Sequence, residues 1–404
     1  MHMILSERKL TLNTLADLLA PTSISEFLEV FHARRRLHIA ASDPTRAEKL
    51  FSWQDIDNFL SAHAFDESVM VLRDGILVPR SFYTSNEGKR LNVRAFHGLL
   101  RQGVSIKVES IDRWVPKIGQ LAASVEREMG IRTQVNAYLT FFKGGAFKPH
   151  WDYHDVVVVQ VYGNKRWRVW KAEMPLPPKT ADPTNVNTKM PPDEEFEMKP
   201  GDLLFIPRGE PHSAAVSTKH SVHLTIGLTS ETGIDFLDYL RKEAAKDPIL
   251  QMDLSRHSTV EQPSAHETLL KHRLHELIDT ACVSQFLRDG DLARSPVLQT
   301  AVTGNCQMED ILRLTLRRRV PLPDVAPHGD AQSVTIGGES LRLSSASIDV
   351  LRWLFDHDPA TLRALYARFM LHYGQDSIEA AIRELLLLGF LVVNRSPHSG
   401  VKEP

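Results

Sequence analysis

The sequence predicts an α+β protein with a mainly β core, a double-stranded β-helix or jelly-roll barrel, followed by helical segments. Residues 155–161 (D-V-V-V-V-Q-V) form a β-branched run typical of a strand buried on both faces. Residues 203–206 form another short apolar run after the turn Gly201-Asp202, and helical periodicity dominates from residue 235 onward. Short buried strands separated by turns are typical of an antiparallel barrel. A chain of 404 residues is too long for one ordinary core and predicts two or three domains.

The residues before the barrel predict helices and one hairpin. Residues 14–64 carry apolar side chains at helix spacing, and residues 118–129 form an amphipathic helix. Asp74-Gly75 lies between two apolar runs within residues 69–78, which is a strong hairpin pattern. The basic run at residues 34–36 is more typical of a solvated surface than of a binding patch.

A histidine and an aspartate two positions apart, His150 and Asp152, followed later by His212, predict a metal site. In an extended strand, residues i and i+2 point to the same side, so His150 and Asp152 can reach one metal while Trp151 faces away. His212 would come from another strand of the same barrel. Two histidines and one carboxylate are the facial triad of non-haem Fe(II) oxygenases, which leaves the opposite face of the metal for a cosubstrate and O₂.

The segments between these residues predict the path of the barrel. Gly163-Asn164 has hairpin character and leads into a return strand over residues 165–170. Residues 171–199 are rich in Pro, Lys and acidic side chains, and they predict a long loop between two strands, a candidate lid or substrate-recognition arm. We expect the barrel core to occupy residues 132–229.

These motifs resemble those of a known enzyme family. H-W-D at residues 150–152, G-N-K-R-W-R-V-W at residues 163–170 and the set Gly201, Pro207, Gly209 and His212 together resemble the cupin-4 branch of the JmjC oxygenases, the ribosomal-oxygenase-like enzymes. The resemblance covers about residues 14–250. It implies a cupin/JmjC fold that uses Fe(II), 2-oxoglutarate as cosubstrate and O₂. The implied reaction hydroxylates an amino-acid side chain of a protein or peptide, such as a ribosomal protein or a ribosomally made peptide, and releases succinate and CO₂.

The resemblance also assigns residues to the cosubstrate. In that family a basic residue fifteen positions after the first histidine ligand binds the distal carboxylate of 2-oxoglutarate, and that position is Lys165. Thr225 matches a threonine near the same carboxylate, and Asn136 and Tyr138 match an Asn-x-Tyr pattern beside the cosubstrate or peptide. The plainer interpretations are a solvated hairpin lysine for Lys165 and an ordinary strand residue for Thr225.

Three further histidines flank the motif. His154 shares the face of His150 and Asp152, which is compatible with a ligand, a partner of a ligand or a substrate contact, although a structural role is more typical. His220 and His223 alternate on the closing strand and are expected to be structural.

The sequence departs from the family at the substrate entrance. Relatives have a Thr-Pro pair and an H-x-D-D sequence where this chain has T-F-F-K at residues 140–143 and D-Y-H-D at residues 152–155. The substrate therefore need not be a ribosomal protein.

Composition excludes several classes of function. The net charge of −2 gives no bulk attraction to nucleic acid or to an anionic membrane. Cys282 and Cys306 provide neither a disulfide framework nor a zinc cluster. The first ten residues resemble neither a signal peptide nor a membrane span, and no run of eighteen apolar residues occurs, so a cytoplasmic protein without membrane contact is expected.

The C-terminal part predicts two further domains. Residues 235–245, 264–287 and 308–316 follow helical periodicity without a strand pattern. They indicate a helical module over residues 235–322, after a catalytic domain at 1–234, and the resemblance implies that it forms a homodimer interface. Residues 323–404 predict a winged helix, as in family members, in the order strand, three helices and hairpin-like strand. Its third helix, after Asp376-Ser377, has no basic stripe, so protein contact is favoured over DNA binding.

Three functions therefore stay open from the sequence. The first is a 2-oxoglutarate-dependent hydroxylase of a protein or peptide. The second is a winged-helix regulator whose barrel senses 2-oxoglutarate or metal, and the third is a non-oxidative metal cupin. The position of Lys165 argues against the third, and the acidic third helix argues against the second.

Overall fold

The computed structural model describes residues 12, 14–63, 66–85, 90–141, 147–254, 265–292, 308, 310–316, 319–326, 329–336 and 339–394. The predictions for the first ten residues, for residues 142–143 of the entrance and for Cys306 lie outside these ranges. The chain forms two compact units, Met1–Thr229 and Ser230–Pro404, and each is described by itself. Within the described residues, none of the helices combines the length and apolarity needed to cross a membrane.

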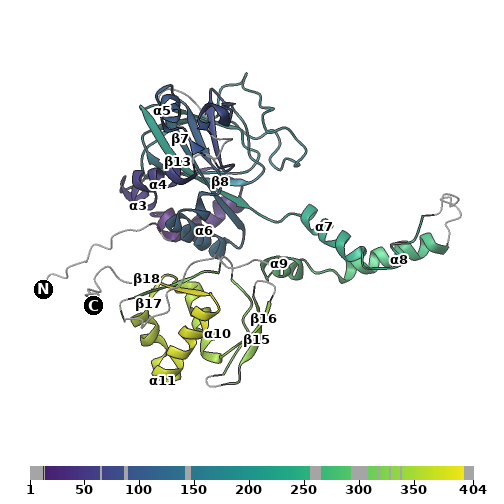
Figure 1. The fold of residues 1–404 in the computed structure, drawn as a ribbon. Coiled ribbons are helices and arrows are strands. Elements are labelled where there is room, and N and C mark those ends of the chain that lie inside the picture. Colours follow the sequence, from purple (N-terminus) through teal and green to yellow (C-terminus); the bar gives the residue numbers. More distant parts are fainter. Residues whose placement is uncertain are drawn as a thin grey trace. The chain divides into compact units, whose positions relative to one another are not determined.

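Unit 1 is built on an antiparallel sheet that has eight strands in the described residues. Across the sheet the order is β1 (Leu37–Ile39), β11 (Leu203–Ile206), β8 (Asp155–Tyr162), β13 (His220–Thr229), β7 (Arg132–Phe141), β6 (Ser105–Val108), β2 (Val69–Arg73) and β3 (Ile76–Leu77). β13 pairs with β7 along its whole length and with β8 along most of it, and Figure 1 shows these three strands together.

A second sheet closes the barrel. In it, β9 (Lys165–Val169) lies between β10 (Glu194–Met198) and β12 (His212–Val216). Val156 and Val158 of the large sheet pack with Trp167 and Met198 of the small sheet in one buried cluster. The two sheets therefore face each other, which confirms the predicted antiparallel barrel.

The alternation of side chains in β8 explains its β-branched run. Val156 and Val158 face the small sheet, whereas Val157, Val159 and Val161 point into the main core of the unit on the other side. The strand is buried on both faces, as predicted.

Helices cover that main core. Its apolar side chains come from the large sheet and from the helices α1 (Leu15–Leu19), α2 (Ile24–His32), α3 (Arg46–Leu50), α4 (Trp53–His63), α5 (Val93–Arg101) and α6 (Pro116–Met129). Short elements complete the unit: β4 (Thr84–Ser85), β5 (Arg90–Leu91) and the 3₁₀ turns Arg80–Phe82 and Ile111–Arg113. Thr14 and Ser23 begin α1 and α2 with capping boxes, which satisfy backbone N–H groups of the first turn.

One predicted hairpin is confirmed and another is wrong. Asp74 and Gly75 join β2 to β3 with φ values of 52° and 77°, as a tight two-residue turn requires. Gly163-Asn164 instead connects strands of different sheets, because β8 pairs with β11 and β13 while β9 pairs with β10 and β12. A Cβ at Gly163 would lie 2.0 Å from the carbonyl oxygen of His220, so β13 passes directly beside this turn.

Two other expectations for unit 1 need correction. The predicted loop over residues 171–199 ends at residue 193, because Glu194–Met198 form β10, an edge strand whose exposed acidic side chains concealed it. The basic run is only partly solvated. Arg35 is exposed, but Arg34 and Arg36 form ion pairs with Asp155 and Glu210, at 3.0 Å and 3.3 Å.

Unit 2 begins with α7 (Gly233–Ala244), α8 (Ala265–Thr280) and α9 (Val283–Leu292), so helices occur where residues 235–245 and 264–287 predicted them. Residue 264 itself lies outside the described ranges. Phe236 and Tyr239 of α7 form an aromatic cluster with Phe286 of α9, with ring centroids 5.4–6.0 Å apart. Ile234 and Leu237 of α7 are exposed.

The rest of unit 2 has its own apolar core. β14 (Ile311–Leu314) lies between β17 (Ala360–Thr361) and β18 (Leu391–Asn394), next to the hairpin of β15 (Gln332–Ile336) and β16 (Glu339–Leu343) and the helices α10 (Ser345–His357) and α11 (Leu362–Leu387). Gly374, with φ 72°, divides α11 into two halves, so three helical segments occur here as predicted.

The predicted helix over residues 308–316 is wrong. Ile311–Leu314 form a strand, and Leu312, Leu314 and Leu316 are buried at a spacing of two. A short apolar run fits both periodicities, and pairing with β17 and β18 decides for the strand.

Candidate metal centre

The three residues of the predicted triad come together in one cavity, which residues of both sheets also line. One nitrogen of His150, one of His212 and one carboxylate oxygen of Asp152 all lie within 4.8 Å of one another. Nε2 of His212 is 3.5 Å from Oδ2 of Asp152. His212 is buried, while His150 and Asp152 are partly exposed, so the group is open on one side.

The backbone around the triad differs from the predicted strand. His212 is the first residue of β12, but His150 and Asp152 precede β8, and His150 forms only an isolated bridge with His212. The backbone groups of residues 150–152 bond to two other segments, one around Pro183 and one over residues 209–212. His150 exchanges two hydrogen bonds with His212, the N–H of Trp151 donates to Pro183, and the carbonyl of Asp152 accepts from Gly209. The segment that carries His150 and Asp152 is therefore held by two distant segments rather than by one neighbouring strand.

Hydrogen bonds fix which nitrogen each histidine presents. Nδ1 of His150 lies 2.9 Å from the carbonyl oxygen of Lys148, and Nδ1 of His212 lies 3.0 Å from that of Glu210. A neutral imidazole that donates from Nδ1 keeps its lone pair on Nε2, as metal-binding histidines do. Burial lowers the pKa of His212, which favours the neutral form that a metal needs.

Lys165 lines the same cavity as the triad. It is the first residue of β9, and its side chain is 1 % exposed. Nζ lies 2.9 Å from Nδ1 of His223, and no carboxylate of the described residues pairs with it. Burial lowers the pKa of Lys165 to about 7. The arrangement is a buried amine without a negative partner, which suits an anionic ligand.

His223 belongs to this site, although the sequence suggested a structural role. Its ring stacks on Tyr138 with centroids 4.8 Å apart and meets the edge of Trp167. Burial and then the positive charge of Lys165 lower the pKa of His223, so the ring is neutral and accepts from Lys165. The alternation of His223 with Thr225 on one strand is the pattern that could have identified it.

The other predicted cosubstrate residues divide into two groups. Tyr138 and Thr225 line the cavity, whereas Asn136 is not among the residues around it. Asn136 lies opposite Thr225 in the sheet, but its side-chain oxygen accepts hydrogen bonds from the Ser110 N–H and the Gln134 amide. Burial, and then the charge of Asp152, raise the pKa of Tyr138, so its hydroxyl stays protonated.

The other two histidines near the motif, His154 and His220, are not among the residues that line the cavity. His154 is partly exposed, and its ring would lie 2.7 Å from a Cβ at Gly227, so this glycine leaves room for it. His220 is exposed and meets the ring of Trp53 edge-on.

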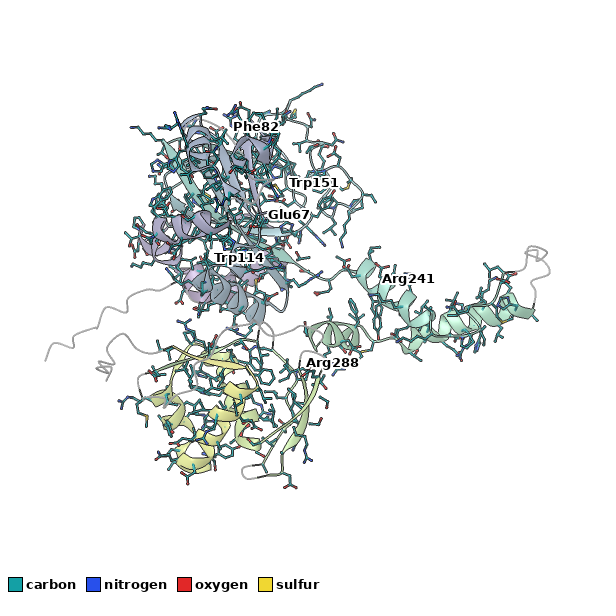
Figure 2. All side chains as sticks on the ribbon, in the orientation of Figure 1. Glu67, Phe82, Trp114, Trp151, Arg241 and Arg288 are labelled. Atoms are coloured by element: carbon teal, nitrogen blue, oxygen red, sulfur yellow. The ribbon has the colours of Figure 1, made fainter. Side chains whose placement is uncertain are left out.

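An irregular segment, residues 171–193, lies against the chain that carries Asp152. Trp151 donates its backbone N–H to Pro183, and the Tyr153 hydroxyl donates to the carbonyl of Ala181. Trp151 is labelled in Figure 2. Trp151 and Trp170 line a second cavity, of about 660 Å³, together with this segment. The predicted candidate arm therefore directly contacts the segment that carries Asp152.

Comparison with known proteins identifies the domain. Residues 112–236 match the family model described as "JmjC domain". The chain is 27% identical over 223 residues to the "Bifunctional lysine-specific demethylase and histidyl-hydroxylase NO66" of Drosophila willistoni, covering 53% of this chain and 28% of that protein. It is also 27% identical over 218 residues to "Ribosomal oxygenase 2" of Rattus norvegicus, covering 52% and 46%. The chain thus spans less than half the length of these relatives.

Solved structures share the fold. The structure of E. coli ycfD covers 92% of this chain and 98% of its own, with a TM-score of 0.57 at 16% identity. The structure described as YcfD, "a Ribosomal oxygenase from Escherichia coli in complex with Cobalt and 2-oxoglutarate", has the same coverage and identity with a TM-score of 0.53.

Proposed function

Since the chain is a JmjC-domain protein related to NO66, ribosomal oxygenase 2 and YcfD, we propose that it is an Fe(II)- and 2-oxoglutarate-dependent oxygenase. We further propose that it hydroxylates an amino-acid side chain of a protein or peptide. The observation that carries the proposal is the cluster of His150, Asp152 and His212 in one cavity with the amine of Lys165, which has no carboxylate partner among the described residues.

The residues fit both the metal and the cosubstrate. Two imidazole Nε2 atoms and one carboxylate match the donor set of non-haem Fe(II) sites. Lys165 and Thr225 line the same cavity and would offer an ammonium group and a hydroxyl to the distal carboxylate of 2-oxoglutarate. A dicarboxylate that reaches the metal at one end and Lys165 at the other would satisfy the buried amine.

The roles of the side chains follow from this placement. His150, Asp152 and His212 would hold the metal on one face, and the metal supplies the site for 2-oxoglutarate and O₂. Lys165 would bind the distal carboxylate, and His223 would accept one of its hydrogen bonds. Trp167, Val156 and Val158 contribute apolar surface to the cavity wall.

The names of the relatives support a protein substrate. One is described as a histidyl-hydroxylase and another as a ribosomal oxygenase. The segment of residues 171–193 touches the chain that carries Asp152, and it is our candidate for substrate recognition. We also propose that α7–α9 form a dimer contact, because Ile234 and Leu237 are exposed there, and that residues 323–404 are a winged helix that contacts protein.

Replacement of a triad residue tests the proposal. We expect His150→Ala and Asp152→Ala to reduce succinate formation from 2-oxoglutarate to the level of metal-free protein, while circular dichroism stays that of the wild type. The matched control is His220→Ala, because His220 is an exposed histidine outside the cavity. Undiminished succinate formation by either triad variant would show that the reaction does not occur at this site.

A further inference from the structure

The two segments that carry the triad are joined by a hydrogen-bond network outside the cavity. These segments are residues 150–155 and residues 207–212. The Gly209 N–H donates to the Asp152 carbonyl at 3.0 Å, and the Arg208 N–H donates to Oδ1 of Asp155 at 2.8 Å. The distance between the ligands therefore depends on how firmly these segments are joined.

Arg34 contacts both segments from a third element. It lies between α2 and β1, and its guanidinium forms a two-pronged ion pair with Asp155, at 3.0 and 3.3 Å. The same guanidinium donates to the carbonyl oxygen of Arg208 at 3.4 Å. The Asp155 side chain is only 4 % exposed, so this pair is partly shielded from water.

The backbone conformation at position 34 does not favour an arginine. Arg34 has φ 54°, in the left-handed region. Its N–H donates to Phe31 and the N–H of Arg35 donates to Val30, which is the Schellman ending of a helix. Glycine or asparagine is the ordinary residue at this position, and other residues are strained there. The helix end alone would favour glycine, so the contacts of the guanidinium explain the arginine.

We propose that Arg34, through Asp155, is a positioning residue for the metal centre. Together with the backbone hydrogen bonds between His150 and His212 and between Gly209 and Asp152, it holds residues 150–155 at a set distance from residues 207–212, and hence Asp152 from His212. This inference rests on the proposed function only in assuming that the triad binds a divalent metal.

The variant Arg34→Asn separates positioning from folding. Asparagine tolerates the left-handed conformation better than arginine does. The substitution therefore relieves backbone strain, and this offsets part of the stability that is lost with the ion pair. We expect the variant to be folded at the assay temperature and to bind Co²⁺ about 10-fold more weakly, the lower end of the loss seen when residues that support metal ligands are replaced. Affinity is measured by Co²⁺ titration of the full chain, followed by visible absorbance.

Two further variants make the test specific. Arg35→Asn changes the exposed neighbour and should leave Co²⁺ affinity within about 2-fold of the wild type, since Arg35 does not reach the network. Asp155→Asn should weaken binding as Arg34→Asn does, and the double variant should lose no more than the stronger single variant, because both changes break one linkage.

The outcomes are distinguishable. A folded Arg34→Asn protein with wild-type Co²⁺ affinity would overturn the positioning role, and so would additive losses in the double variant. A variant that is unfolded at the assay temperature would assign Arg34 to global stability and would also overturn it. Absence of Co²⁺ binding by the wild type would instead refute the proposed function.

Discussion

At the residue scale, the cavity combines two neutral imidazole rings with one buried amine. Burial lowers the pKa of His212 and of His223, so both rings are neutral, and His223 accepts a hydrogen bond from Lys165. Burial also lowers the pKa of Lys165 to about 7, so its charge depends on what binds beside it. A carboxylate next to Lys165 favours the ammonium form, which couples ligand binding to a proton.

Binding of 2-oxoglutarate should therefore take up a proton above neutral pH. At pH 8 the free Lys165 is mostly neutral, but it must be charged in the complex, so affinity falls as pH rises above about 7. Calorimetry of Mn²⁺-loaded protein, in buffers of different ionisation enthalpy, should show an uptake that approaches one proton. Lys165→Met should lose both affinity and uptake, whereas Lys219→Met, an exposed lysine, should lose neither. Binding at pH 8 without proton uptake would contradict this prediction.

The lowered pKa of Lys165 also makes the stability of the folded chain depend on pH. The direction is opposite to that of a lysine in an ion pair, whose pKa is raised. The pKa of Lys165 is lower in the folded chain than its ordinary value of 10.5. Between about pH 7 and 10.5 the unfolded chain holds more protons, so the contribution of Lys165 to stability rises with pH over this window and is least favourable below it.

Much of the site was visible as sequence, and the rest depended on packing. The i, i+2 spacing placed His150 and Asp152 on one face, the later His212 completed a known set of metal ligands, and the family resemblance assigned Lys165. His223 was missed because its role comes from the ring of Tyr138 and the amine of Lys165, which lie on other strands. Arg34 was missed for the same reason, since Asp155 and Arg208 are distant in the chain.

At the element scale, the residues of the triad are positioned by the loops between strands rather than by long strands. The loop between β11 and β12 carries Gly209, which has φ 82° and donates to the Asp152 carbonyl. A Cβ at Gly209 would lie 2.6 Å from the carbonyl oxygen of Met174. This position thus joins the ligand-bearing loops to residues 171–193.

Gly209→Ala should damage this junction. The left-handed backbone costs an alanine about 1–2 kcal/mol, and the close approach to Met174 adds to that. We expect a loss of about 2 kcal/mol or more in the free energy of unfolding, measured with denaturant. Gly98→Ala is the matched control, because a Cβ at this position in α5 meets nothing within 4 Å and alanine should stabilise the helix by about 0.5–1 kcal/mol. Equal stabilities for the two variants would refute the strain at Gly209.

The strand β8, which is buried on both faces, could be predicted from the sequence, whereas the strands β10 and β14 could not. The valines of β8 revealed a strand because both faces are apolar. β10 was missed because its acidic side chains face solvent on an edge strand. β14 was mistaken for a helix because its strand character comes from pairing with β17 and β18, which lie some 50 to 80 residues further along the chain.

At the scale of the whole molecule, the main apolar cores of the two units share no described residue. One is formed by the helices and barrel of unit 1, and the other by β14–β18, α10 and α11 of unit 2. All residues of the triad and Lys165 belong to unit 1. The sequence indicated more than one domain from length and from the change in periodicity at residue 235, while the division into 1–234, 235–322 and 323–404 stays a prediction.

Separate cores predict separate unfolding. In calorimetry of the full chain, we expect two transitions, because each unit buries its own apolar surface. A metal that binds the native triad stabilises only the unit that contains it, by about 2.7 kcal/mol at a concentration 100 times the Kd. Co²⁺ should therefore raise the midpoint of one transition and leave the other unchanged, and EDTA should reverse the shift. Asp152→Ala identifies the responding transition, because its midpoint should no longer move. A single transition that Co²⁺ shifts as a whole would show that the units unfold together, and the metal would then stabilise the whole chain.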